Sequence, residues 1–264
     1  MTTVKDGFII NGVNENNTNF NIINYKTYPE LKLREGNDVR PRLTRWIRSI
    51  VLHTTKGIWP QTVLKGMGSF TNVGKKVANF WSTNLNNAGA HLVVDWDGTI
   101  SCHCDLLTQA AYHAGVVNEV SIGIEVFQGS NGELYERQLE TVAELVNWLT
   151  IRFSIQRQMP ASNCYGLIKR CVAGGKDVVG VYSHRNVTNQ RSRGDCGDYI
   201  FDYIFKLAKY EIFDFERYED MRVWRERQTK VLGISFNNTD GIPGPQTVDG
   251  LRFLGYPSGL WTLK

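Results

Sequence analysis

The chain has 264 residues, of which 42% are hydrophobic and 21% are charged, so it can bury the core of an ordinary globular protein. Its net charge of +4 comes from Lys and Arg that are spread along the chain, which argues against nucleic acid as a partner. No stretch approaches the roughly 20 apolar residues of a membrane span. The N-terminus lacks the basic start and apolar core of an export signal. We therefore expect neither membrane insertion nor a signal peptide.

The first half of the chain predicts an irregular arm followed by strands and a helix. Residues 1–40 are rich in Asn with scattered apolar side chains, which indicates an N-terminal arm laid on a main domain. The run TRWIRSIVLH is short and β-branched, as in a buried strand, and it ends in His53. An interrupted helical pattern follows over 61–81. Two strands are then predicted around the Asp-Gly turn signal at 97–98.

The second half continues this alternation of strands and helices. SIGIEVF (121–127) predicts a buried strand, and the apolar spacing over 135–153 predicts an amphipathic helix. DVVGVYSH predicts a strand that again ends in a histidine, His184, and residues 199–213 predict a last helix. This order indicates an α/β fold with a central mixed β-sheet flanked by helices.

A short C-terminal segment is predicted to form a separate module. The charged run 215–230 separates the main domain from turn signals at 240–245 and a short predicted helix over 246–254. We therefore divide the chain into an N-terminal arm (1–40), a catalytic domain (41–212) and a small helical module (213–264). Such a module is too small to be stable without its neighbours.

Two strand-end histidines and an acid indicate the chemistry of the main domain. A catalytic zinc needs three protein ligands and a fourth position for water, and His53, His184 and the Asp195-Cys196 pair offer such ligands. Zinc lowers the pKa of a bound water toward about 7 and polarises a carbonyl, which suits amide hydrolysis. Glu125 could shuttle the proton, and Arg193 could hold the oxyanion.

Each of these residues also has a plainer interpretation. A single strand-end histidine is more often a structural hydrogen-bonding group than a ligand, whereas a Glu within an apolar strand is rarely buried unless it is paired or functional. His113 could be an ordinary histidine, although its loop setting favours contact with a ligand. His91 is more consistent with a core or supporting group.

The five cysteines do not indicate a disulfide framework, because their number is odd and their density low. The Cys102-His103-Cys104 run resembles a metal cluster at first sight. Alternation along a strand would place both thiols on one face and the imidazole on the other, so we expect two small core residues.

The segment from about Arg45 to about Lys209 resembles the zinc-dependent N-acetylmuramoyl-L-alanine amidases, a group that includes bacteriophage lysozyme-type amidases and peptidoglycan recognition proteins. The resemblance rests on IVLHTT, GAHLVVDWDGTI, AYHAGVVNEVSIGIEV and SHRNVTNQRSRGDCGD, in that order. It implies that His53 and His184 bind zinc and that Glu125 assists the attacking water. His113 and Asn118 are implied to be residues of a substrate-binding loop.

The third zinc ligand is where the chain departs from the family pattern. The family usually has Asp or Cys followed by Pro, whereas this chain has Asp195-Cys196-Gly197. The resemblance favours Asp195 as the ligand, with Arg193 in the place of a basic residue, while a shift of one position would make it Cys196. A second departure is Ala90, where some members carry a Tyr.

The resemblance implies a zinc amidase that cleaves the bond between N-acetylmuramic acid and the L-alanine of the stem peptide. The alternatives are a recognition protein that binds peptidoglycan without cutting it and a hydrolase of another amide polymer. The C-terminal DGIPGPQTVDGLRF resembles half of a small helical peptidoglycan-binding repeat, against the alternative of a packing extension.

The biological setting is expected from the same resemblance. A wall-lytic domain without a signal peptide fits a monomeric phage endolysin, made in the host cytoplasm and acting on the cell wall after release. A virion-associated lysin and a delivered toxin are the other settings considered.

Overall fold

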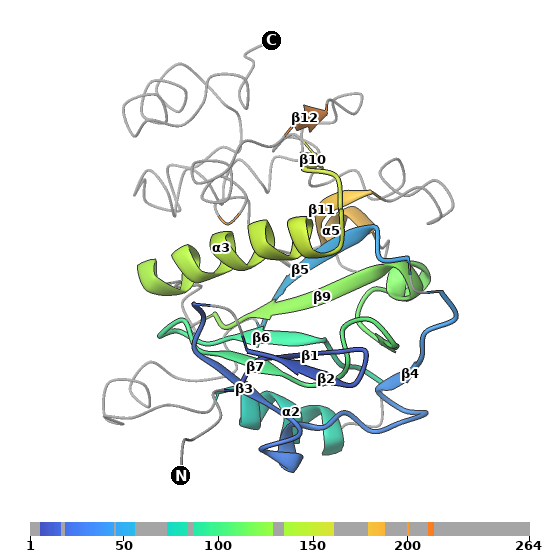
Figure 1. Ribbon diagram of the computed structural model, residues 1–264, viewed down its shortest axis with the longest axis vertical. Helices are drawn as coiled ribbons and strands as arrows, with labels where there is room; N and C mark the ends of the chain where they lie inside the picture. Colours follow the sequence, from blue (N-terminus) through green and yellow to red (C-terminus); the bar gives the residue numbers. More distant parts are fainter. Residues whose placement is uncertain are drawn as a thin grey trace, which may run out of the picture.

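The computed structural model describes residues 6–16, 19–44, 46–55, 73–83, 87–128, 135–160, 179–187, 200 and 211–213. Their centre is a six-stranded sheet with the strand order β11-β5-β9-β6-β7-β3 (Figure 1). The strands are β3 (Ile22–Asn24), β5 (Ser49–Thr54), β6 (Leu92–Val94), β7 (Ile100–Cys102), β9 (Ser121–Val126) and β11 (Gly180–Ser183). All neighbours are parallel except β6 and β7, which confirms the predicted mixed sheet.

The antiparallel pair β6–β7 is the hairpin predicted from the sequence. Gly98 has a φ of 83°, a left-handed conformation that glycine adopts without a steric penalty. The Asp97 side chain also accepts a hydrogen bond from the Thr99 backbone N–H at 2.9 Å. This turn reverses the chain between the two strands.

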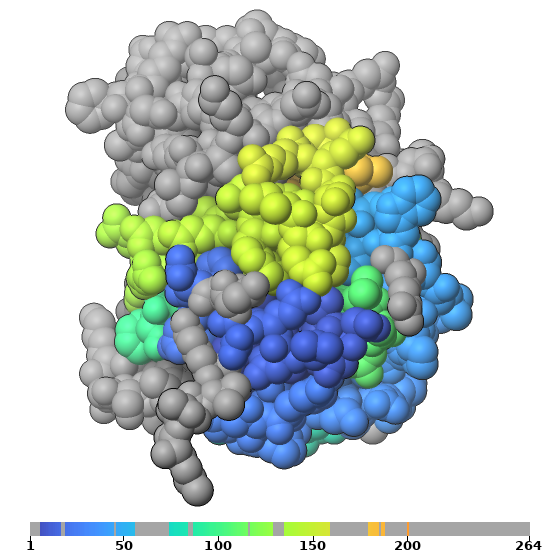
Figure 2. Space-filling view, in the orientation of Figure 1, coloured from blue at the N-terminus to red at the C-terminus, as the bar shows by residue number. Residues whose placement is uncertain are grey.

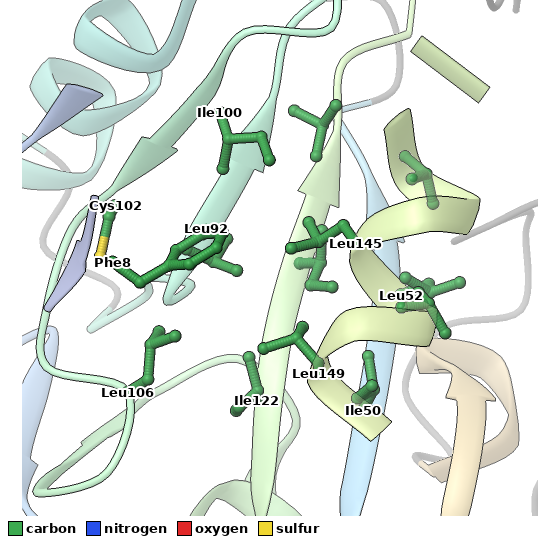
Figure 3. Packing of buried hydrophobic residues seen from close by; sticks show 14 of the residues in the cluster. Phe8, Ile50, Leu52, Leu92, Ile100, Cys102, Leu106, Ile122, Leu145 and Leu149 are labelled. Carbon is green, nitrogen blue, oxygen red and sulfur yellow. The ribbon is translucent and has the colours of Figure 1, made fainter. Parts of the chain in front are cut away.

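One face of the sheet is covered by the helix α3 (Glu136–Arg152), which confirms the predicted amphipathic helix. Val142, Val146 and Leu149 recur at helical spacing and are fully buried. Figure 3 shows Leu145 and Leu149 packed toward Ile50, Leu52 and Ile122 of the sheet. Because side chains alternate along a strand, the residues between these isoleucines and leucines point to the other face.

The second face carries the helix α2 (Val73–Thr83) and the 3-10 turn η2 (Gly115–Val120). Val77 and Trp81 of α2 join a buried cluster with Val93 of β6, and Figure 1 shows α2 on the side of the sheet opposite α3. Val117 of η2 packs with Val51 of β5 and with β11. The strand-end side chains His53 and Glu125 belong to this second face.

The N-terminal residues are more regular than the predicted arm. They form the hairpin of β1 (Phe8–Ile10) and β2 (Val13–Glu15), the edge strand β3, the 3-10 turn η1 (Pro29–Leu31), and β4 (Val39–Pro41) paired with β8 (Gln109–Ala111). Phe8 stacks on Trp148 of α3 with ring centroids 4.6 Å apart. Figure 2 shows this segment, in dark blue, lying against α3. These short strands are therefore part of the core, and the expectation of an irregular arm was wrong.

The C-terminal side differs from the prediction at one element. Residues 211–213 form β12 (Glu211–Phe213), which pairs in parallel with β10 (Gln158–Pro160), so the end of the helix predicted over 199–213 is a strand. Ile212 and Phe213 are residue types that favour strands. The predicted module 213–264 lies, after its first residue, outside the described residues. Among the described helices, none has the length and apolarity to cross a membrane.

Candidate metal and catalytic site

Three predicted site residues meet at the ends of three adjacent parallel strands. His53 of β5 is in register with Glu125 of β9, and Ser183 of β11 is in register with Leu52. His184 follows Ser183 directly, and its ring centroid lies 4.5 Å from that of His53. The carboxyl ends of β11, β5 and β9 thus place two histidines and a glutamate at neighbouring positions on one edge of the sheet.

The turn after β11 fixes where His184 begins its short helix α5 (His184–Val187). The Asn186 side-chain oxygen accepts hydrogen bonds from the Ser183 backbone N–H at 2.8 Å and from the Ser183 hydroxyl at 3.1 Å. Asn186 and Ser183 are both fully buried. This closed turn directs the chain away from the sheet immediately after the strand and holds His184 beside His53.

His113 reaches the site from the loop that precedes η2. Its Nδ1 lies 3.1 Å from Nε2 of His53, and its Nε2 lies 3.0 Å from the hydroxyl of Ser121 at the start of β9. The ring occupies space that only a glycine leaves open, since a Cβ atom on Gly123 would lie 2.5 Å from Cγ of His113. His113 was predicted to contact substrate, and the structure places it against a predicted zinc ligand.

Asn118 shapes the loop that carries His113. Its side-chain oxygen accepts hydrogen bonds from the backbone N–H groups of His113 at 3.2 Å and Ala114 at 2.7 Å. The Asn118 side chain is 6% exposed. In the described structure it closes the turn, and its predicted role in binding substrate remains a prediction.

Arg42 fastens η2 to the rest of the domain. Its guanidinium donates hydrogen bonds to the backbone oxygens of Asn118 at 3.0 Å, Glu119 at 2.6 Å and Ser121 at 3.0 Å. Burial lowers the pKa of Arg42 to about 10, so the group is still charged at neutral pH. Nothing in the sequence around residue 42 pointed to this function.

The histidines behind the site are held in the neutral form. Burial lowers the pKa of His113 well below its ordinary value, and the neighbouring His53, His91, His184 and Arg42 lower it further. Burial and Arg42 do the same to His91. The Gly123 backbone N–H donates to Nδ1 of His91 at 3.0 Å, so His91 supports β9 from within the core.

The residues at this edge fit a zinc ion in part. Imidazole nitrogens and carboxylates are common zinc ligands, and the rings of His53 and His184 lie side by side with centroids 4.5 Å apart. Within the described ranges no group of three or more His, Cys, Asp or Glu is gathered for a metal. The predicted third ligand, Asp195 or Cys196, and the predicted Arg193 lie outside the described residues.

Cys102 and Cys104 are buried free thiols, and their run with His103 forms no metal site in the described part of the chain. They pack in different clusters because β7 ends at Cys102, so alternation does not carry through to Cys104. His103 is hydrogen-bonded to the Leu31 carbonyl through Nδ1 at 2.9 Å and to the Ser101 hydroxyl through Nε2. The prediction that both cysteines are core residues is confirmed. The prediction that they share one face of a strand was wrong.

Besides Arg42, two supporting residues were missed in the sequence, although one of them left a signal. A glycine inside an otherwise β-branched strand often marks a close approach by another group, and Gly123 in SIGIEV is such a case. Ser121 gave no signal, because a serine at the start of a strand is ordinary.

Comparison with known proteins identifies the family of this chain. A family model described as N-acetylmuramoyl-L-alanine amidase (Amidase_2) matches residues 43–196, more than half of the chain. The chain belongs to this family. Membership confirms the resemblance inferred from the sequence motifs. No curated protein matches the chain.

Solved structures similar to this amidase-family chain share little sequence with it. The amidase LysC from Clostridium intestinale URNW is 16% identical, with 70% of this chain and 95% of that chain covered and a TM-score of 0.42. A mutant endolysin from Bacillus subtilis is 18% identical, with 65% and 88% covered and a TM-score of 0.42. Drosophila peptidoglycan recognition protein SD is 18% identical, with 66% and 89% covered and a TM-score of 0.43.

Proposed function

We propose that this protein is a zinc-dependent N-acetylmuramoyl-L-alanine amidase that hydrolyses the amide between N-acetylmuramic acid and the L-alanine of the stem peptide. The observation that carries the proposal is the meeting of His53, His184 and Glu125 at adjacent strand ends within the segment that matches the family model. A binding-only protein needs no acid beside its two imidazoles.

The proposed zinc site uses His53, His184 and a third ligand from Asp195 or Cys196. When bound, zinc would make water nucleophilic at neutral pH and polarise the scissile carbonyl. Glu125 stands in register beside His53, so its carboxylate can take the proton from the attacking water and return it to the leaving amine nitrogen. Arg193 would stabilise the negative charge that develops on the carbonyl oxygen.

Removing one imidazole tests the metal site. We expect wild-type protein to bind one zinc ion and to release new L-alanine amino groups from purified peptidoglycan. His184→Ala should lose both properties, because a ligand contributes to affinity and to the position of the ion. Metal analysis and amine release are measured on the same samples. A His184→Ala protein that keeps zinc and full activity would remove His184 from the site.

We further propose that the protein acts as a phage endolysin and that residues 213–264 bind the cell wall. The match to the family model ends at residue 196, which leaves the C-terminal segment available for a second task. This setting implies synthesis in a host cytoplasm and action on the wall after release.

A further inference from the structure

Three hydrogen bonds run in a row from the η2 backbone to His53. The Ser121 hydroxyl lies 2.7 Å from the Val117 carbonyl oxygen and 3.0 Å from Nε2 of His113. Nδ1 of His113 lies 3.1 Å from Nε2 of His53. Ser121 is completely buried at the start of β9, so it stands behind the histidines rather than at the surface that a substrate would reach.

The direction of each hydrogen bond in this row follows from the carbonyl at its end. A carbonyl oxygen only accepts, so the single hydroxyl hydrogen of Ser121 is donated to Val117. The hydroxyl oxygen must then accept from His113, which places the hydrogen of that ring on Nε2. A neutral imidazole carries one N–H, so Nδ1 of His113 is an acceptor and Nε2 of His53 is the donor.

We propose that Ser121 is a positioning residue that fixes the ring tautomer of His113 and, through it, that of His53. The result is a His53 ring with its hydrogen on Nε2, which leaves Nδ1 as the nitrogen that would bind zinc in the proposed site. The inference rests on the proposed zinc site. Hydrogen bonds behind a metal-binding histidine set both its tautomer and its orientation, and here the row is built from three side chains and one carbonyl.

Gly123 is the second residue that holds His113 in this row of hydrogen bonds. A Cβ atom at this position would lie 2.7 Å from Nδ1 of His113, the atom that accepts from His53. The absence of a side chain therefore lets the ring lie flat enough on β9 to touch both Ser121 and His53. Ser121 and Gly123 point to the same face of β9, two residues apart, as alternation along a strand requires.

Ser49 provides a matched control for Ser121. The two serines are register partners on β5 and β9, and both are completely buried. The Ser49 hydroxyl donates to the carbonyl of Val120, the last residue of η2, at 3.4 Å. Ser49→Ala thus removes an equally buried hydroxyl from the neighbouring strand. The hydrogen bonds that join Ser121, His113 and His53 do not involve Ser49.

The test reads the tautomers directly in the zinc-free protein by long-range proton–nitrogen NMR of the histidine rings. In wild-type protein we expect His113 and His53 each as the single Nε2–H tautomer. Ser121→Ala should mix the tautomers of both rings, Ser121→Thr should restore them, and Ser49→Ala should leave them unchanged. A wild-type spectrum with the His53 hydrogen on Nδ1 overturns the proposal, and this holds even if Ser121→Ala fails to fold.

Zinc affinity gives the second readout, measured by competition with a chromophoric chelator. Ser121→Ala should weaken binding by about 10-fold or more, the usual effect of losing such a supporting contact. Ser49→Ala should bind as wild type does. Unchanged affinity and unchanged tautomers in a folded Ser121→Ala protein would contradict the role of Ser121. The proposed amidase activity can fail independently of this inference. In that case wild-type protein would bind zinc and show the expected tautomers but would release no amino groups from peptidoglycan.

Discussion

Gly123 is the residue of β9 against which the ring of His113 lies. The His113 ring lies over its Cα, in space that any side chain would fill. A substitution here acts on the site through sterics alone, because the backbone of β9 is an ordinary strand that does not require glycine for its conformation.

Gly123→Ala is expected to push His113 away from His53 and to weaken zinc binding by about 10-fold. Overpacking should also lower the free energy of unfolding by about 1–3 kcal/mol. Gly89→Ala is the control, because the atoms nearest to its added Cβ belong to Leu33 and Asp38 and not to a histidine. Zinc competition and urea unfolding measure both effects. Wild-type zinc affinity in Gly123→Ala would show that the ring position does not matter.

At the scale of elements, the buried side chain of Arg42 connects η2 to the chain that precedes β5. Arg42 satisfies three backbone oxygens of the segment from Asn118 to Ser121, and it also contacts His91. The loop that carries His113 is therefore tied to the chain just before β5. The stability of η2 and the position of His113 should change together.

Arg42→Ala is expected to lower the free energy of unfolding by about 3 kcal/mol, because it leaves buried carbonyl oxygens without a donor. The control is Arg40→Ala, which removes a surface ion pair with Glu119 and should cost less than about 1 kcal/mol. Urea unfolding compares the two. Equal losses would mean that η2 does not depend on the buried guanidinium.

The elements that position the candidate site were predictable from the sequence because their signals are local. The β-branched run ending at His53, the Asp97-Gly98 turn and the apolar spacing of α3 each carry their own pattern. The three-residue strands β1 and β3 were missed because their stability comes from packing on α3 and pairing with β7. A pattern of three residues is too short to show a period.

The candidate site was predictable to the same extent. Strand ends fix His53, Glu125 and His184, since parallel neighbours meet at one edge of the sheet. The contact between His113 and His53 depends on a loop conformation set by Asn118 and Arg42, which no local pattern encodes. Long-range hydrogen bonds of this kind become visible only once the fold is known.

At the scale of the whole molecule, the amidase segment and the C-terminal segment are expected to have separable tasks. A chain that ends at residue 213, the last residue of β12, should still release amino groups from soluble muropeptides but should no longer sediment with purified cell walls. Muropeptide cleavage also shows that the shortened chain has folded. Sedimentation equal to that of the full chain would place wall binding in the amidase segment alone.

The proposed amidase reaction requires Glu125 as its acid–base group. The direct measurement is the rate at which free L-alanine amino groups appear from purified peptidoglycan, with zinc content determined in the same samples. Glu125→Gln should keep its zinc and lose activity by about 100-fold or more, while Glu144→Gln, an exposed change on α3, should behave as wild type. Zinc-loaded wild-type protein that binds peptidoglycan and releases no amino groups would contradict the account, as would full activity in Glu125→Gln.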